Sequence, residues 1–170
     1  TFSNLRAYLI SNLLFDCNLD YQKLIDDFFT NYYKDASQYI YKYFSELRDL
    51  EIYNVKVNGM SGFCGANLLS EIYWPKATLL RWEGYINDAY KSIEHLKIEN
   101  SNLYETLYWR INKESLSIRY LLLDIYSFLY DSVELQSLRT KFMEDMNTLQ
   151  IFDYKEGRST SELFSSWGIL

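Results

Sequence analysis

Proline and glycine are scarce in this chain, which has one proline and six glycines among its 170 residues. Both residue types end or weaken helices, so their scarcity favours long uninterrupted helices. Three of the glycines fall within residues 59–65, and the helical pattern fails around them, from 53 to 73. Val55 and Val57 alternate there like a short strand. We therefore expect a helical chain that is interrupted once, by a Gly-rich loop or short hairpin.

Histidine and cysteine are also rare, and their scarcity argues against a metal site. His95 is the single histidine, and the two cysteines, Cys17 and Cys64, lie far from it in the sequence. Zinc needs a full set of Cys, His and carboxylate ligands, so the sequence predicts no metal site. A catalytic triad would also need His95, which lies near the end of an expected helix, where histidine commonly interacts with the helix dipole. The cysteines allow one disulfide at most, and we expect two reduced thiols.

Positive charge and long apolar runs are both in deficit. The chain has 17 Lys and Arg against 23 Asp and Glu, a net charge of −6. Nucleic acids and anionic membrane surfaces attract basic proteins, so this balance argues against both as partners. No apolar run is long enough for a transmembrane helix, so we also expect no membrane insertion.

The sequence predicts no catalytic residue and no cofactor site, and hence no enzyme within this chain. Glycosidases place two carboxyl groups roughly 5 to 9.5 Å apart across a cleft. The acidic pairs here, 26–27 and 144–145, are neighbours that point in different directions on a helix. The Gly-rich run lacks both the Lys-Ser/Thr of a P-loop and the spacing of a dinucleotide-binding loop.

Aromatic residues are abundant, with 17 Tyr, 10 Phe and 4 Trp. Tyrosine combines an apolar ring with a polar tip, which suits half-buried helix flanks and interfaces. Phe63 lies in the Gly-rich run, and Tyr73 and Trp74 follow it. These three are the candidate ligand-binding residues, through stacking against a sugar ring. The plainer interpretation is that the same rings pack down onto the helices.

Apolar residues elsewhere recur at helical spacing, and polar residues that cap helices fall at the breaks. Asp20 can cap a helix, Pro75 suits a first helical position, and capping-box spacings begin at Asp35, Asp131 and Ser159. The fold class predicted is all-α, an antiparallel bundle of six to seven helices in a single domain over residues 1–170. The expected helices cover about 3–14, 21–32, 35–50, 75–95, 103–130, 132–149 and a short segment after Ser159.

Three stretches resemble, in the same order, the C-terminal helical part of a family known only as a domain of unknown function. They are 4–44, with an acidic helix and an aromatic pair; 107–123, LYWRINKESLSIRYLLL; and 142–167, with a Glu-Gly turn before a final helix. Lys34 stands where the family usually has glycine, and Phe15 where it often has tryptophan. The family occurs in glycoside-hydrolase-like proteins related to α-glucuronidases and β-hexosaminidases.

The resemblance implies a context for the chain. Residues 1–15 would be the last helix of an upstream barrel, and the chain would be the C-terminal fragment of a larger protein. Catalytic carboxylates would lie at the ends of barrel strands, outside this sequence. The chain would then be a non-catalytic C-terminal helical module that packs against the barrel and contributes to glycan binding. A secreted, periplasmic or cell-surface location is implied in the same way.

Two further expectations follow. The stripe of Leu5, Leu9 and Leu13 should partly face something outside the chain, whereas its burial within the bundle would indicate a self-contained domain. The alternative function is a free-standing helical protein-interaction module that uses a Tyr-rich surface.

Overall fold

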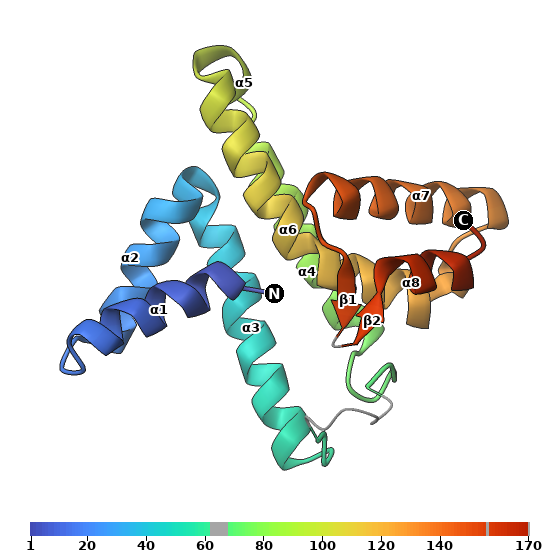
Figure 1. The fold of residues 1–170 in the computed structure, drawn as a ribbon, viewed down its shortest axis with the longest axis horizontal. Coiled ribbons are helices and arrows are strands. Elements are labelled where there is room, and N and C mark those ends of the chain that lie inside the picture. Colours follow the sequence, from blue (N-terminus) through green and yellow to red (C-terminus); the bar gives the residue numbers. More distant parts are fainter. Residues whose placement is uncertain (62–67, 156, 170) are drawn as a thin grey trace. The chain divides into compact units, whose positions relative to one another are not determined.

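The computed structural model describes residues 1–61, 68–155 and 157–169, and most of them are helical (Figure 1). The all-α fold class is therefore confirmed. The described residues form one sheet, a two-stranded antiparallel hairpin near the C-terminus. The elements are α1 (Ser3–Phe15), α2 (Tyr21–Tyr33), η1 (Lys34–Ala36, a 3-10 helix), α3 (Ser37–Lys56), α4 (Lys76–Ser92), α5 (Leu96–Glu99), α6 (Ser101–Ile125), η2 (Ser127–Leu129, also 3-10), α7 (Ser132–Thr148), β1 (Asp153–Lys155), β2 (Arg158–Ser159) and α8 (Thr160–Ser166).

Three helices begin at the caps that the sequence predicted. The Asp20 carboxylate accepts hydrogen bonds from the N–H groups of Gln22 and Lys23, at 2.9 and 3.1 Å. Asp131 accepts two such bonds at 2.9 Å each in the first turn of α7. Ser159 accepts one at 3.4 Å in the first turn of α8. Each side chain satisfies backbone donors that the helix leaves unpaired, which is why these signals are readable from the sequence.

The structure corrects two expected elements. Val55 lies in the last turn of α3, and the N–H of Val57 still bonds to the carbonyl of Tyr53 at 2.8 Å, so the predicted strand is wrong. Two valines two positions apart are too few to separate a strand from a helix end. The fourth expected helix is also broken after Ser92, and residues 96–99 form the separate short helix α5. The central part of the expected Gly-rich loop lies outside the described residues.

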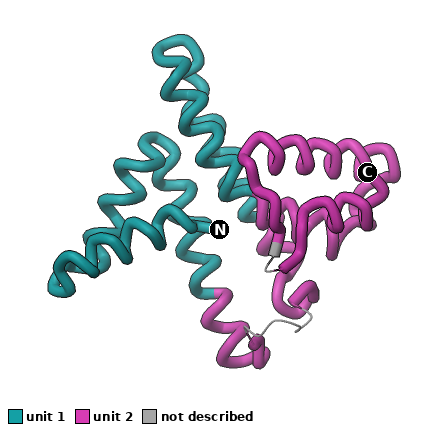
Figure 2. The backbone as a smooth tube through the Cα atoms, in the orientation of Figure 1, with its two compact units in different colours: residues 1–49, 81–115 teal, residues 50–80, 116–170 magenta. Residues whose placement is uncertain are grey.

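The chain forms two compact units, shown in Figure 2. Unit 1 consists of residues 1–49 and 81–115, and unit 2 of residues 50–80 and 116–170. Helices α3, α4 and α6 each contribute residues to both. Each unit is therefore built from two separate stretches of the sequence.

Unit 1 has an aromatic core between α1, α2, α3 and α4. The ring of Phe29 lies 5.0 to 6.0 Å from five neighbouring rings, among them Tyr33, Phe44 and Phe2. Such ring pairs contribute stability beyond their buried area. Its buried apolar residues include Phe2, Leu5, Leu9, Ile25, Phe28, Phe29, Tyr33, Ile40, Tyr43, Trp82, Ile86, Ile93, Leu107 and Ile111.

Unit 2 has a smaller core, which α6, α7 and α8 share. The indole of Trp167 packs against Phe142 with ring centroids 5.5 Å apart, and its Nε1–H points to Asp124 at 3.4 Å. The core residues are Leu116, Leu123, Phe142, Met146, Leu163, Phe164 and Trp167.

Candidate docking surface

Helix α1 carries apolar side chains on two faces. Leu5 and Leu9 are 3% and 8% exposed, and Leu13 is half-buried. The turn after α1 is short, so α2 folds back along this face, and the ring of Tyr8 lies 5.5 Å from that of Phe28. The expectation that this stripe faces something outside the chain is therefore wrong: unit 1 covers it, and this burial is the outcome expected of a self-contained domain.

The opposite face of α1 is the exposed one. Ile10, Leu14 and Phe15 are 53%, 83% and 94% exposed, and Leu19 in the following turn is 38% exposed. Ile10 and Leu14 are four positions apart and so share one face of the helix. We call these four residues the outer patch. Full burial of a side chain of this size is worth about 1.5–3 kcal/mol, so a partner surface that covered the patch would gain several kcal/mol.

The turn that carries part of the outer patch is ordered by its own hydrogen bonds. The Asp16 N–H bonds to the Asn12 carbonyl at 2.9 Å and closes the end of α1. The Asp16 carboxylate accepts the Asn18 N–H at 2.9 Å, an Asx turn that leads to the Asp20 cap. Cys17, between them, is an exposed free thiol, whereas Cys64 lies outside the described residues. The exposed apolar side chains therefore project from a fixed backbone.

The start of α1 is anchored by Phe2 and Glu114. The Phe2 ring is 7% exposed and lies 5.1 Å from the ring of Phe44 and 5.4 Å from that of Tyr43. Its backbone N–H donates to Oε2 of Glu114 on α6 at 2.7 Å. The Tyr33 hydroxyl, at the end of α2, donates to the other carboxylate oxygen at 3.1 Å. One buried side chain thus joins α1, α2 and α6.

Arg110 lies one turn before Glu114 on α6 and binds the same end of α2. Its Nη1 donates to the Tyr32 carbonyl at 2.6 Å, and its guanidinium lies 3.9 Å from the centroid of the Tyr32 ring. A cation at a helix C-terminus is favourable because the last carbonyls carry partial negative charge. The Tyr32 hydroxyl in turn accepts a bond from Asn4 of α1. Arg110 and Glu114 therefore fix both α1 and α2 against α6.

Burial governs the ionisation of this cluster. It raises the pKa of Glu114, against the opposing effects of the Phe2 N–H, the Thr1 amino group, the Tyr33 hydroxyl and Lys113. Burial, followed by the nearby Glu114, also raises the pKa of Tyr33 far above its usual range. The tyrosine therefore stays a neutral donor, while the carboxyl group is more easily protonated than an exposed glutamate.

A second carboxylate of unit 1 ties α3 to α4. Glu46 accepts hydrogen bonds from Arg81 Nε and Trp82 Nε1 at 2.9 Å each, and from the Tyr85 hydroxyl at 2.8 Å. Burial raises the pKa of Glu46, but the bonds from these three donors outweigh it and lower the pKa overall. This carboxylate is occupied by protein donors and serves to hold two helices together.

Two of the predicted ligand-binding residues are tied into unit 2. Tyr73 and Trp74 are half-buried. Trp74 Nε1 donates to the Leu68 carbonyl at 2.8 Å, and the Tyr73 carbonyl accepts from Asn54 Nδ2 at 2.8 Å. Phe63 lies outside the described residues. Ligand binding by these three residues stays a prediction.

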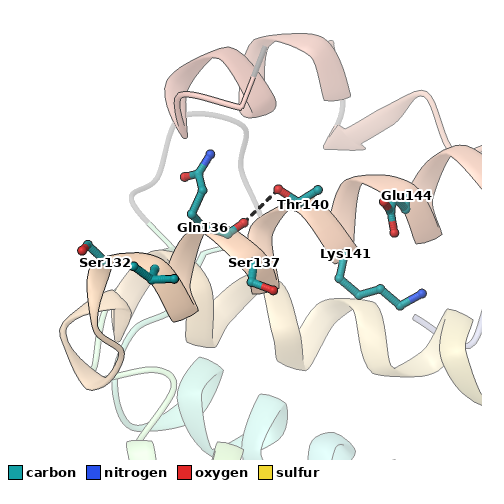
Figure 3. Close-up of a pocket in the computed structure, with 7 residues that line it drawn as sticks. Ser132, Gln136, Ser137, Thr140, Lys141 and Glu144 are labelled. Atoms are coloured by element: carbon teal, nitrogen blue, oxygen red, sulfur yellow. Dashed lines mark hydrogen bonds between the residues drawn. The ribbon is translucent and has the colours of Figure 1, made fainter.

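An open depression of about 560 Å³ lies along α7 in unit 2. Figure 3 shows that its side chains all rise from that one helix, and that the Thr140 hydroxyl is bonded to the Gln136 carbonyl, at 2.9 Å. It holds one carboxylate among the lining residues, whereas glycoside hydrolysis needs two that face each other. The lining residues are Ser132, Val133, Gln136, Ser137, Thr140, Lys141 and Glu144.

His95 lies in the turn before α5. Its Nε2 is 3.3 Å from Oδ2 of Asp35 and 3.9 Å from Oε2 of Glu99. Within residues 1–61, 68–155 and 157–169, no three His, Cys, Asp or Glu side chains are grouped so that they could hold a metal ion. In the same part of the chain, no helix has the length and apolar character needed to cross a membrane.

A family model described as "Domain of unknown function (DUF4838)" matches residues 1–45. The match covers α1, α2, η1 and the first half of α3, and it includes the whole outer patch. The resemblance to a domain-of-unknown-function family is confirmed over these residues. No curated protein and no solved structure matches the chain.

Sequence reasoning missed the outer patch and Glu114. The signal for the patch was present, because Ile10 and Leu14 have helical spacing, but the sequence could not show which face of α1 is covered. Arg110 and Glu114 have the four-residue spacing of side chains on one helix face. Their partners lie about 80 to 110 positions away along the chain, a separation that local patterns do not record.

Proposed function

We propose that this chain is a non-catalytic C-terminal helical module of a carbohydrate-active, glycoside-hydrolase-like protein, and that the outer patch packs against the barrel of that protein. The observation that carries the proposal is the exposure of Ile10, Leu14 and Phe15 on a helix whose other face is already covered. The family match supports it, because the matched residues contain the patch. A secreted or cell-surface location belongs to the same proposal.

The roles of three carboxylates support a non-catalytic module. Glu46 and Glu114 in unit 1 each bind donors from other helices. Asp145 in unit 2 is 2% exposed and lies 2.6 Å from Arg119. These groups hold helices together, so the chemistry of the larger protein is proposed to lie outside this chain.

The test compares the larger protein with the isolated chain. Ile10→Glu with Leu14→Glu should lower the thermal stability of the module within the larger protein, where the patch is covered. Each charge would enter an apolar contact worth about 1.5–3 kcal/mol. In the isolated 170-residue chain the same pair should change stability little, because both side chains face solvent.

The matched control is Ile98→Glu, on α5 of the same unit, where the side chain is 94% exposed. It should leave both proteins unchanged. An unaltered melting temperature of the larger protein with Ile10→Glu and Leu14→Glu would contradict packing through the outer patch.

The glycan part of the proposal rests on the predicted residues Phe63, Tyr73 and Trp74. Titration calorimetry with acidic and amino sugars, on the larger protein and on this chain, separates the roles. We expect binding by the larger protein that Trp74→Ala weakens. Equal and tight binding by the isolated chain would show that the module is a sugar-binding domain in its own right.

A chain of half-buried aromatic rings favours the second candidate function, a helical protein-interaction module. The rings of Tyr90 and Tyr108 are 5.2 Å apart, and Tyr104 and Trp109 lie 6.0 and 5.3 Å from Tyr108. Tyrosine and tryptophan are enriched where proteins bind one another. Under this alternative, Tyr108→Ala removes partner binding, whereas Ile10→Glu with Leu14→Glu has no effect.

A further inference from the structure

The start of α1 is held at one point by a single ionisable group. Glu114 is 2% exposed, and its two oxygens accept the Phe2 N–H at 2.7 Å and the Tyr33 hydroxyl at 3.1 Å. Both of these donors are neutral. The group that joins the three helices is therefore one whose own charge can change while its donors stay the same.

We propose that Glu114 is a proton-dependent latch that holds the start of α1 to α2 and α6 more tightly in mild acid than at alkaline pH. The latch is internal to unit 1, so it does not depend on the proposed function. It would act on the helix that carries the outer patch.

The geometry accommodates the protonated acid. Its carbonyl oxygen can accept the Phe2 N–H, and its O–H can donate to the hydroxyl oxygen of Tyr33, because a tyrosine hydroxyl both donates and accepts. The ionised form keeps both bonds but holds a full charge in a site from which water is excluded. Protonation therefore relieves desolvation without leaving the carboxyl group unbonded.

The charged groups around Glu114 come from three directions. The Thr1 amino group approaches from the start of α1, and Lys113 lies beside it on α6; both favour the ionised form. Tyr33 on α2 is the hydroxyl donor. Arg110 is bound to the carbonyl and ring of Tyr32, and acts on Tyr33. Burial outweighs all of these, and the net effect is a raised pKa for Glu114.

The direction of the pH effect follows from this shift. A group whose pKa is higher in the folded than in the unfolded protein contributes stability that is complete below its unfolded pKa, near 4.3 for glutamate. That contribution is lost as the pH rises through the folded pKa. For one proton, the equilibrium between attached and detached α1 changes by at most about tenfold per pH unit.

Hydrogen exchange of the α1 amides, corrected for intrinsic rates, tests the latch between pH 5 and pH 8. His95→Gln is the background for every variant, so that no imidazole contributes to the slope. We expect the protection of residues 3–15 to fall as the pH rises, by up to about tenfold per pH unit. Glu114→Gln, which stays neutral, should keep α1 equally protected at every pH. The amides of α7, in unit 2, are the internal reference.

Two further variants make the result decisive. Tyr33→Phe removes a donor that favours the ionised form, so the fall in protection should persist but move to higher pH; this variant also serves if Glu114→Gln does not fold. An N-terminally acetylated chain should keep the slope. The latch is overturned if wild-type α1 protection is independent of pH or if Glu114→Gln shows the same slope. It is also overturned if Tyr33→Phe does not move the fall in protection to higher pH, or if acetylation abolishes that fall.

Discussion

Among the described residues, each unit buries one carboxylate to the same extent, yet the two units stabilise it by opposite means. Glu114 in unit 1 and Asp145 in unit 2 are both 2% exposed. Glu114 accepts bonds from a backbone N–H and a tyrosine hydroxyl. Asp145 lies between two cations: Arg119 Nη1 is 2.6 Å from Oδ2, and Lys141 Nζ is 3.1 Å from Oδ1. The contact of Lys141 with Asp145 is ionic and lacks the alignment of a hydrogen bond.

The two sites differ in the partners that compensate a buried carboxylate. A carboxylate such as Glu114, whose bonds come from a backbone N–H and a tyrosine hydroxyl, can be protonated or replaced by an amide, because these two donors carry no charge that depends on it. A carboxylate between cations is not replaced so easily by an amide, because Arg119 and Lys141 then lose their counter-charge. Unit 1 is therefore sensitive to the ionisation of Glu114, whereas unit 2 depends on the ion pairs of Asp145 with Arg119 and Lys141.

The largest effect is expected from removing the cation that binds the buried Asp145 of unit 2. Arg119→Met leaves Asp145 short of a partner and should reduce the free energy of unfolding by about 3–5 kcal/mol, as measured by urea denaturation. The matched control is Arg158→Met, which breaks an exposed pair with Glu162, at 3.2 Å, and should cost under about 1 kcal/mol. Similar losses in the two variants would show that burial does not decide the value of the Asp145 pair.

Tyr33→Phe should have the next largest effect, because it removes one neutral donor from Glu114. Leaving a buried group without its hydrogen-bond partner costs about 1–3 kcal/mol, and the urea midpoint at pH 7 should fall accordingly. Tyr8→Phe, on the half-buried ring of α1, is the control, since its hydroxyl has no hydrogen bond among the described residues. A loss as large in Tyr8→Phe would point to general packing of tyrosines rather than to the Glu114 bond.

Lys34→Gly should stabilise unit 1 by about 1 kcal/mol. Lys34 has φ 51° and ψ −123°, a conformation that glycine adopts readily and lysine does not. In unit 2, Gln150 also has a positive φ, 54°. An ordinary left-handed residue is strained less than Lys34, so Gln150→Gly should raise the stability of the protein less than Lys34→Gly does. Thermal unfolding that shows a loss for Lys34→Gly would contradict strain at this turn.

The smallest effect is expected at Glu46, and its sign is opposite to that of Glu114. The pKa of Glu46 is lowered in the fold, so its contribution is present above the unfolded pKa and is lost as the pH falls through the folded pKa. Glu46→Gln should flatten the acid limb of a stability–pH curve below about pH 5, modestly because solvent reaches the side chain. Glu105→Gln, exposed on α6, is the control and should leave the curve as in the wild type.

Sequence patterns predicted the local parts of the fold and little of the long-range ones. The caps at Asp20, Asp131 and Ser159 were visible because each cap acts within three residues of itself. The break after Ser92 was not, since neither proline nor glycine marks it. Val55 was assigned to a strand because a period of two was seen over too short a stretch.

The candidate docking surface shows the same limit. Apolar residues on both faces of α1 are evident from the sequence, but the short turn to α2 decides that Leu5 and Leu9 are covered while Ile10 and Leu14 are not. The burial of Glu114 depends on Phe2, 112 positions away, and no pattern near either residue indicates their contact.

One comparison tests the difference between the units most directly: urea unfolding of Glu114→Gln and Asp145→Asn at the same neutral pH. Both variants replace a carboxylate of equal burial by the amide of the same shape. We predict that Asp145→Asn loses about 3 kcal/mol or more, because two cations lose their counter-charge. Glu114→Gln should change the free energy of unfolding by under about 1 kcal/mol. Equal losses, or a greater loss in Glu114→Gln, would contradict the account.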